Sequence, residues 1–395
     1  MIYADNAATT KMSEKAIAVM LDCMRHHYGN PSNQFYSVGQ EAKDLLEAAR
    51  EEIAHTINAS PSEIIFTSGG SEADNQAIES AANSGKRKGR THIVSTAFEH
   101  HAVLHTLRKL KKDGFEITLL PVHENGVVDP KELEASLRDD TCLVTVMAVN
   151  NEIGTIQPIA EIGEICEKHG VLFHTDAVQA VGHLPIDVKA EKIGMLSASA
   201  HKFHGPKGVG FLYVRKGIPL INLIEGGAQE RGKRAGTENL AGILSMAAAL
   251  TESVENMEQV KLRLTPIRDA IIRGLSEIPH SALNGDRERR VPGNINFSFE
   301  GIEGESLLIL LDQKGICASS GSACTSGALD PSHVLLSIGR AHEVAHGSLR
   351  LSLSDDVTME EAAYIVSSVS EIVARLRSFS PVWRDLQNGK REYFL

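Results

Sequence analysis

The sequence contains few cysteines, no long apolar run and no excess of basic charge. Its five cysteines are scattered, form no CxxC pair and lack zinc-like spacing to histidine, so we expect neither a disulfide framework nor a metal site. No apolar stretch is long enough to cross a bilayer. MIYADNAATT lacks the pattern of a signal peptide, which favours a cytoplasmic protein. A net charge of −11 argues against nucleic-acid binding.

The middle of the chain alternates short apolar runs with amphipathic stretches. This pattern predicts an α/β fold with a large, doubly wound, mostly parallel sheet. The runs are nearly continuous in apolar character, as expected of strands that are buried on both faces. The predicted strands are 63–68, 92–97, 116–122, 142–149, 171–176, 193–199 and 209–214, and the predicted helices between them include 72–83, 102–114, 130–139 and 158–170.

The pattern changes at about residue 258. Two runs, 294–299 and 348–354, alternate polar and apolar residues, which is typical of a sheet with one solvated face. Long helices are predicted over 261–278 and 359–377, the second behind a capping box formed by Thr358 and Glu361. These elements predict a smaller α+β domain.

A chain of 395 residues is long enough for two domains. We expect a large domain over 15–257, and a small domain that combines 1–14 with 258–395. The polar tail, 380–395, is expected to be ordered only in part.

The stretch TSGGSEADNQAI, residues 67–78, has the composition of a phosphate-binding turn. A strand ends, two glycines follow, and a helix starts near Gly70 and Ser71. Glycine lets the backbone approach a ligand closely, and the helix start offers free N–H groups with a positive dipole end. A plain strand-to-helix turn with a serine cap fits this segment equally well.

One predicted strand ends at an acid, and a second is followed by a lysine. The run VLF leads to Asp176, and IGMLSAS leads to Lys202. Pyridoxal 5'-phosphate (PLP) needs a lysine amine for its aldehyde and a carboxylate for its ring nitrogen. Gln179 would reach the ring hydroxyl, and two further residues would hold the phosphate, namely Ser199 and His201. Taken alone, Asp176 also fits a helix N-cap, and Lys207 is a rival for the lysine.

Several motifs along the chain together resemble one enzyme family. These are YADNAATT, GNPSN, FTSGGSEADN, EHHAV, VNNEIGTIQP, HTDAVQ, SASAHKFHGPKGVG, RAGTEN and SSGSACTSG. In this order they resemble the cysteine desulfurases, which are fold-type-I PLP enzymes related to the class V aminotransferases. The resemblance covers nearly the whole chain and implies a PLP-dependent homodimer. Two departures occur: Gly70-Ser71 replaces the common Ala-Thr, and LSLSDD after Arg350 replaces a glycine-containing continuation.

The resemblance also implies roles for residues outside the lysine segment. His100 resembles the histidine that stacks on the cofactor ring and serves in acid/base steps, although the residues alone do not choose between it and His101. Asn151 resembles the asparagine near the ring hydroxyl and the substrate carboxylate, and Thr237 a phosphate ligand from the other subunit. Arg350 resembles the arginine that clamps the substrate carboxylate, but a solvated arginine would give the same pattern.

Cys324 lies in CASSGSACTSGALDPS, a stretch of small residues without an apolar period. A thiol in such a loop is a candidate nucleophile, and an incidental exposed thiol is the alternative. Asp330 and Pro331 are expected to cap the helix that follows. Cys317, Cys142 and Cys166 are interpreted as structural.

The resemblance therefore implies a cysteine desulfurase, with L-cysteine as its substrate, a persulfide on Cys324 and an iron–sulfur scaffold or another protein as the sulfur acceptor. A selenocysteine lyase or a class V aminotransferase would use the same PLP residues. An inactive partner in a sulfur-transfer complex is the alternative outside enzymes.

Overall fold

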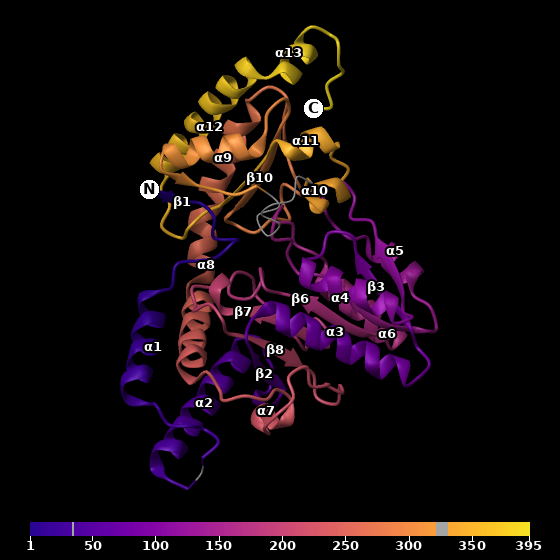
Figure 1. Cartoon of the computed structure of the whole chain (residues 1–395), viewed down its shortest axis with the longest axis vertical. Helices are drawn as coiled ribbons and strands as arrows, with labels where there is room; N and C mark the ends of the chain where they lie inside the picture. The colour runs from indigo at the N-terminus through magenta and orange to yellow at the C-terminus, as the bar shows by residue number, and fades with distance from the viewer. Residues whose placement is uncertain (34, 321–330) are drawn as a thin grey trace.

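The computed structural model describes residues 1–33, 35–320 and 331–395. A seven-stranded sheet, in the order β2-β8-β7-β6-β5-β3-β4, fills its lower part in Figure 1. The strands are β2 (Ile64–Thr67), β3 (His92–Thr96), β4 (Glu116–Leu120), β5 (Thr141–Thr145), β6 (Leu172–Asp176), β7 (Met195–Ser199) and β8 (Gly210–Val214). Strand β8 is antiparallel to β2 and β7, and the other pairings are parallel. The prediction of a mostly parallel α/β sheet is confirmed.

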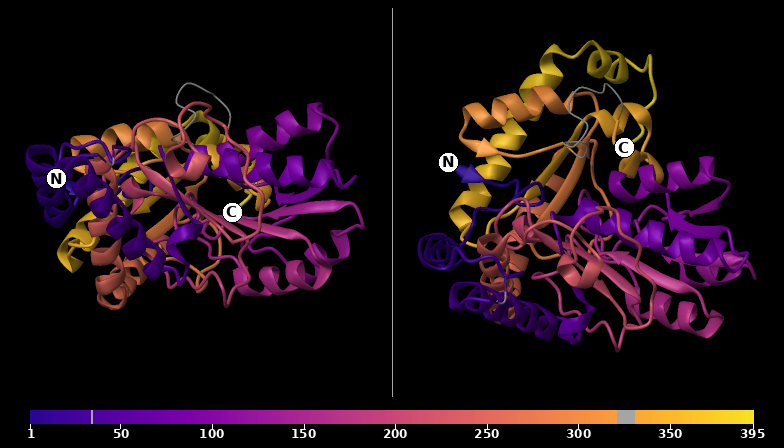
Figure 2. Two further views of the ribbon diagram at one scale, coloured as in Figure 1. Left: turned by 90° about the horizontal axis from the view of Figure 1, so that it is seen from below. Right: turned by 60° about the horizontal axis from the view of Figure 1, so that its bottom comes forward.

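Helices cover both faces of this sheet, as the left view of Figure 2 shows. Neighbouring residues of β2 enter different cores: Ile65 packs in the core beside α3 and α4, and Ile64 packs in the core of α2, α6 and the first half of α8. Burial on both faces explains why these strands read as continuous apolar runs. The helices in this part are α1 (Glu14–His26), α2 (Ser37–Thr56), α3 (Gly70–Lys86), α4 (His101–Lys112), α5 (Pro130–Ser136), α6 (Ile159–His169) and α7 (Gln229–Gly232), with the 3-10 turns η1 (Pro61–Glu63) and η2 (Ala200–Lys202).

The upper part of the molecule holds a smaller antiparallel sheet with the order β12-β10-β9. Its strands are β9 (Ser281–Leu283), β10 (Asn294–Phe299) and β12 (Ser348–Ser352), and β1 (Ile2–Tyr3) pairs in parallel with β11 (Ile316–Cys317) nearby. The helices are α9 (Gly304–Gln313), α10 (His333–Ser337), α11 (His342–His346), α12 (Met359–Phe379) and α13 (Pro381–Gln387). The predicted capping box of Thr358 and Glu361 is present at the start of α12.

One helix, α8 (Leu240–Ser276), runs from the lower part to the upper part (Figure 1). Its residues up to Leu250 pack in a core of the large sheet, and those from Leu264 onward pack in the core of the small sheet. The helix predicted to begin at 261 therefore begins much earlier and contains Pro266 within it. The proposed domain boundary at 257/258 falls between the two packed halves, and the division into 15–257 and 1–14 with 258–395 stays a prediction.

The polar face of the small sheet is buried, contrary to the expectation of a solvated face. Asn296 and Arg350 are opposite each other in the register and are 0% and 2% exposed. Asn296 Nδ2 donates to the carbonyl of Glu152 at 3.0 Å, and Arg350 Nη1 donates to the carbonyl of Asn151 at 3.1 Å. A polar loop from the other part of the chain thus takes the place that water was expected to occupy.

The C-terminal tail is also better ordered than expected. The indole of Trp383, in α13, lies under the guanidinium of Arg377 at 4.0 Å, and Tyr393 stacks on His280 at 3.8 Å. The Glu300 carboxylate accepts hydrogen bonds from the last two backbone N–H groups, at 2.9 and 3.2 Å. Aromatic and charged contacts therefore hold a segment whose composition suggested disorder.

In the described residues, no helix has both the length and the apolar character that crossing a bilayer requires.

Candidate active site

The predicted site residues meet at one edge of the large sheet. Asp176 is the last residue of β6, and Ser199 ends the adjacent strand β7. The turn η2 follows at once and carries His201 and Lys202. Because parallel strands bring their carboxyl ends to the same edge, these side chains come together, as predicted.

A cluster of three titratable side chains, two buried carboxyl groups and a partly buried histidine, surrounds the end of β6. One ligand atom from each of Asp74, His100 and Asp176 lies within 4.8 Å of the others. This set suits either a metal ion or a protonated ring nitrogen, and the prediction of no metal remains untested. His101, in contrast, packs its ring 4.8 Å from His333 and 5.1 Å from His105. The geometry thus favours His100 over His101 as the site histidine.

The two carboxyl groups of the cluster are both buried but differ in how readily they ionise. Burial raises the pKa of both, and the nearby Asp176 charge raises that of Asp74 further, to well above its usual range. Contacts with His100, the Val178 N–H and Lys202 partly offset the burial of Asp176. Since two carboxylates this close cannot both ionise readily, the proton resides on Asp74 and Asp176 is the better carrier of negative charge.

Sequence reasoning missed Asp74. It lies in α3, is 1% exposed, and its Oδ1 has no hydrogen-bond partner among the described residues. His174 Nε2 lies 3.6 Å from that oxygen. The available signal was a single acid between Ala73 and Ala77 on the buried side of the helix, which costs free energy unless another group compensates it.

Lys202 points at the N-terminal segment. Its Nζ donates to the carbonyl oxygens of Ala7 at 2.6 Å and of Ala8 at 2.9 Å. Gln179 Nε2 donates to the same Ala7 oxygen at 2.9 Å, so the two predicted residues share a partner. The rival Lys207 is exposed. Sequence reasoning missed Ala7 and Ala8 as partners, because they act through backbone carbonyls that leave no side-chain signal.

The glycine-rich turn has the geometry of an anion cradle. Gly69 has φ 149°, a conformation that L side chains rarely adopt, and α3 begins at Gly70. A Cβ at Gly69 would lie 3.4 Å from Ser199 Oγ, so the backbone passes close to that hydroxyl. Ser71 is exposed beside the helix start, whose first N–H groups have no acceptor within the helix. The residues present therefore fit a phosphate group at this position.

His201, also predicted to hold phosphate, hydrogen-bonds through Nδ1 to Thr9 Oγ1 at 3.1 Å. Burial, together with Lys202 and Lys207, lowers its pKa to about 4. It is therefore neutral near pH 7 in this structure.

Gly70, where relatives commonly have alanine, lies where a larger side chain would be too close to a neighbour. A Cβ at Gly70 would lie 2.5 Å from Val178 Cγ2, and the N–H of Val178 donates to Asp176 Oδ1 at 3.0 Å. Overpacking of this kind costs about 1–3 kcal/mol. We expect Gly70→Ala to raise the Kd for PLP roughly five- to hundredfold, because Val178 must shift and take Asp176 with it.

The measurement is an absorbance titration of the purified chain with PLP. Adding Val178→Ala to Gly70→Ala should restore most of the affinity, and Val178→Ala alone serves as the control. Equal Kd values for Gly70→Ala and the wild type would contradict this steric account.

Arg350 is buried next to the N-terminal segment. Its Nη2 donates to Asp5 Oδ1 at 2.8 Å, and its Nε has no partner among the described residues. Its backbone pairs with that of Ser319 just before residue 321. The solvated-arginine interpretation is therefore wrong, because a guanidinium this deeply buried needs acceptors. Asn151 lies beside it and accepts from Nη1 through its carbonyl.

The remaining predicted residues are less constrained. Thr237 is exposed, as a group offered to another molecule would be. Cys324 lies outside the described residues. Helix α10, which follows it, is capped by the Ser332 hydroxyl, with Pro331 just before the cap, and the predicted cap residue Asp330 lies outside the described residues. Cys142 and Cys166 are buried, as predicted.

Comparison with known proteins places this site in one family. The family model described as aminotransferase class-V matches residues 2–365. The chain is 51% identical over 394 residues to the cysteine desulfurase IscS of Clostridium botulinum, with 99% of each chain covered. A solved NifS-like protein is 37% identical with a TM-score of 0.89, covering 95% of this chain and 100% of its own.

A second solved structure, SspA in complex with cysteine, is 33% identical with a TM-score of 0.79 and covers 89% of this chain and 99% of its own. The match in sequence and in fold extends over nearly the full length in each case. The chain therefore belongs to the aminotransferase class-V family and, within it, to the cysteine desulfurases.

Proposed function

We propose that this chain is a PLP-dependent enzyme that removes sulfur from L-cysteine, releasing L-alanine and leaving a persulfide on Cys324. The observation that carries the proposal is the meeting of Lys202, Asp176 and the Gly69–Gly70 turn at one sheet edge. PLP requires an amine, a carboxylate and a phosphate cradle, and these three features supply them. When bound, PLP provides an electron sink for the carbon that loses its proton.

The cofactor would be held at both ends. The phosphate would bind at the start of α3 through Gly70 and Ser71, with Ser199 and His201 beside it. The ring nitrogen would face Asp176, the better carrier of negative charge in the buried pair. His100 lies within reach of that carboxylate and would stack on the ring. Gln179 and Asn151 would lie near the ring hydroxyl.

Lys202 would act as the general base and acid that moves the α-proton of the substrate. Its amine, at hydrogen-bond distance from two carbonyls, is oriented before substrate arrives. It would take the α-proton of cysteine and later return a proton to the product. Arg350 would bind the substrate carboxylate, together with Asn151. The Arg350 guanidinium is already desolvated, and its Nε is available for an additional acceptor.

The thiolate of Cys324 would attack the sulfur of the substrate. One sulfur–sulfur bond forms, the carbon–sulfur bond of cysteine breaks, and its electron pair stays with the carbon, which takes a proton to become alanine. The reaction thus converts L-cysteine and an enzyme thiol into L-alanine and an enzyme persulfide. Cys324 lies inside a stretch of small residues, whereas Cys317 lies at its start, and such a stretch suits a group that must reach a buried substrate.

The proposal includes a homodimer, in which Thr237 of one subunit contacts the phosphate of the other. The exposure of Thr237 supports this arrangement. It also includes a cytoplasmic location and transfer of the persulfide sulfur to an iron–sulfur scaffold or another acceptor protein. No nucleic acid and no membrane take part.

The test is a product assay on the purified chain loaded with PLP. With L-cysteine and a thiol reductant, we expect alanine and sulfide in equal amounts. Without reductant, mass spectrometry should find 32 Da added to the peptide of Cys324, as a single sulfur atom requires. Products only from selenocysteine, or amino transfer only with an added keto acid, would assign a related activity. Absence of PLP absorbance after loading would point to a non-catalytic partner.

A further inference from the structure

His204 follows Lys202 by two residues and is fixed to the N-terminal segment by its backbone. Its φ of 64° lies in the left-handed region that non-glycine residues rarely adopt. The His204 N–H donates to Thr10 Oγ1 at 2.9 Å, and its carbonyl accepts from the Ser13 N–H at 3.0 Å. Two hydrogen bonds to one segment hold a backbone conformation that is costly by itself.

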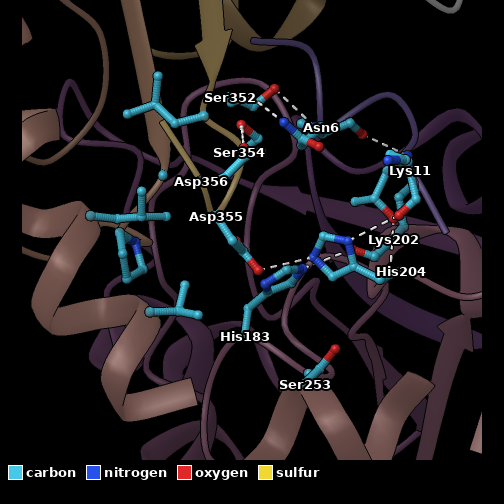
Figure 3. A pocket seen from close by; sticks show the side chains of 18 of the residues that line it. Asn6, Lys11, His183, Lys202, His204, Ser253, Ser352, Ser354, Asp355 and Asp356 are labelled. Carbon is cyan, nitrogen blue, oxygen red and sulfur yellow. Dashed lines mark hydrogen bonds and ion pairs between the residues drawn. The ribbon is translucent and has the colours of Figure 1, made fainter. Parts of the chain in front are cut away.

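The ring of His204 bridges the same N-terminal segment and the loop after β12 (Figure 3). Its Nδ1 lies 3.1 Å from the carbonyl oxygen of Lys11, and its Nε2 lies 3.2 Å from Asp355 Oδ2. Both partners are acceptors. A neutral imidazole has only one N–H, so it can satisfy only one of them, whereas the imidazolium satisfies both. The geometry alone thus selects the protonated ring.

The charges around the ring agree with that geometry. Burial lowers the pKa of His204, but Asp355, the Lys11 carbonyl and Glu252 outweigh it, so the net pKa is raised. The pKa of Asp355 is lowered, because His204, His183 and Arg263 outweigh its burial. The two partners therefore shift in the directions that a stable ion pair requires.

This pair is connected to Lys202 through the N-terminal segment, and His183, whose charge acts on Asp355, contacts the Lys202 backbone. The segment that His204 holds, residues 10–13, continues directly from Ala7 and Ala8, whose carbonyls receive the Lys202 amine. His183, whose pKa is lowered by burial, hydrogen-bonds through Nε2 to the Lys202 carbonyl at 2.8 Å. Asp355 comes from the loop after β12, the strand that carries Arg350. The pair lines a cavity of about 920 Å³.

We propose that His204 and Asp355 form a clamp between the Lys202 turn and the β12 loop, and that the clamp positions the Lys202 amine when His204 is protonated. Both are positioning residues. Asp355 belongs to LSLSDD, the sequence that replaces the glycine-containing continuation common in the family. In the structure Asp355 pairs with His204. The inference rests on the proposed role of Lys202 in cofactor binding.

The sign of the pH dependence follows from the raised pKa of His204. The ion pair is fully present below the ordinary histidine value of 6.5 and is lost as pH rises through the raised pKa. Above that pH one of the two acceptors loses its N–H donor. The 5–13 segment should then be held less firmly.

The first test measures protonation directly on the full chain loaded with PLP. Histidine labelled with ¹³C at Cε1 gives one NMR signal per ring, and His204→Gln identifies the signal of His204. We expect that signal to titrate above 6.5 in the wild type and at a lower pH in Asp355→Asn, because burial is then less opposed. Asp356→Asn is the matched control, because Asp356 is bonded to Ser354 and not to His204. A titration unchanged by Asp355→Asn would overturn the clamp.

The second test connects the clamp to Lys202. In the wild type, kcat for alanine release should show an inflection at the pH where the His204 signal titrates. Asp355→Asn should lose that inflection and have a kcat on the order of tenfold lower at pH 6, as a displaced amine predicts, with KM nearly unchanged. Coinciding profiles for Asp355→Asn, Asp356→Asn and the wild type would refute the positioning role. A wild type without desulfurase activity would refute the proposed function instead, and leave the NMR result to decide on the ion pair.

Discussion

Lys202→Ala is expected to abolish covalent attachment of PLP and to lower desulfurase activity by at least about 10³-fold, the usual contribution of a group that moves a proton and binds the cofactor. The physical reason is that no other described amine lies at this sheet edge with its donors already oriented toward backbone carbonyls. The measurement is borohydride reduction of the loaded protein, followed by peptide mapping of the attached cofactor.

Two further variants serve as controls for the Lys202→Ala experiment. Lys202→Arg keeps a cation that can donate to the carbonyls of Ala7 and Ala8, so it separates loss of chemistry from loss of local structure. Lys207→Ala removes the exposed rival and should leave attachment unchanged. Cofactor found on Lys207 after reduction of Lys202→Ala would reassign the site lysine.

Cys324→Ala should separate cofactor binding from sulfur transfer. The variant keeps Asp176, Lys202 and the glycine cradle, so PLP absorbance and affinity should equal those of the wild type. Sulfide release in the presence of a reductant should fall by at least about 10³-fold, because the nucleophile that accepts sulfur is gone. The measurement pairs a sulfide assay with mass spectrometry of the persulfide.

Cys317→Ala is the matched control, since this partly exposed thiol lies only a few residues away in β11. It should keep full activity. Full sulfide release by Cys324→Ala, with the persulfide appearing on another cysteine, would contradict the assignment of the nucleophile.

Much of the fold could be predicted because the large sheet is buried on both faces. Ile64 and Ile65 enter different cores, so the strand has no polar alternation and is easily recognised. The polar face of the small sheet was misjudged for a related reason. A two-residue period reports which face is polar, but it does not distinguish water from a polar loop such as the one containing Asn151.

The chemistry of the site was predictable where it depends on side chains in motifs, as for Lys202 and Asp176. It was missed where it depends on backbone or on tertiary position. Ala7 and Ala8 contribute carbonyl oxygens, which every residue has. Asp74 contributes a buried carboxyl group from a helix that is otherwise amphipathic, and only the fold brings it next to Asp176.

The attachment of the N-terminal segment also has a consequence for the order of events during synthesis. Residues 2–3 pair with 316–317, and Asp5 bonds to Arg350, so the segment obtains these partners only when most of the chain has been made. The last strand of the large sheet ends at Val214, and the buried α8 residues that pack on it end at Leu250, so this part can form earlier, since domains fold as they emerge. The lysine turn would then form before the segment that carries Ala7 and Ala8 is fixed by its pairing with residues 316–317 and by Arg350. A nascent chain stalled before residue 316 should therefore contain the sheet but lack the finished site.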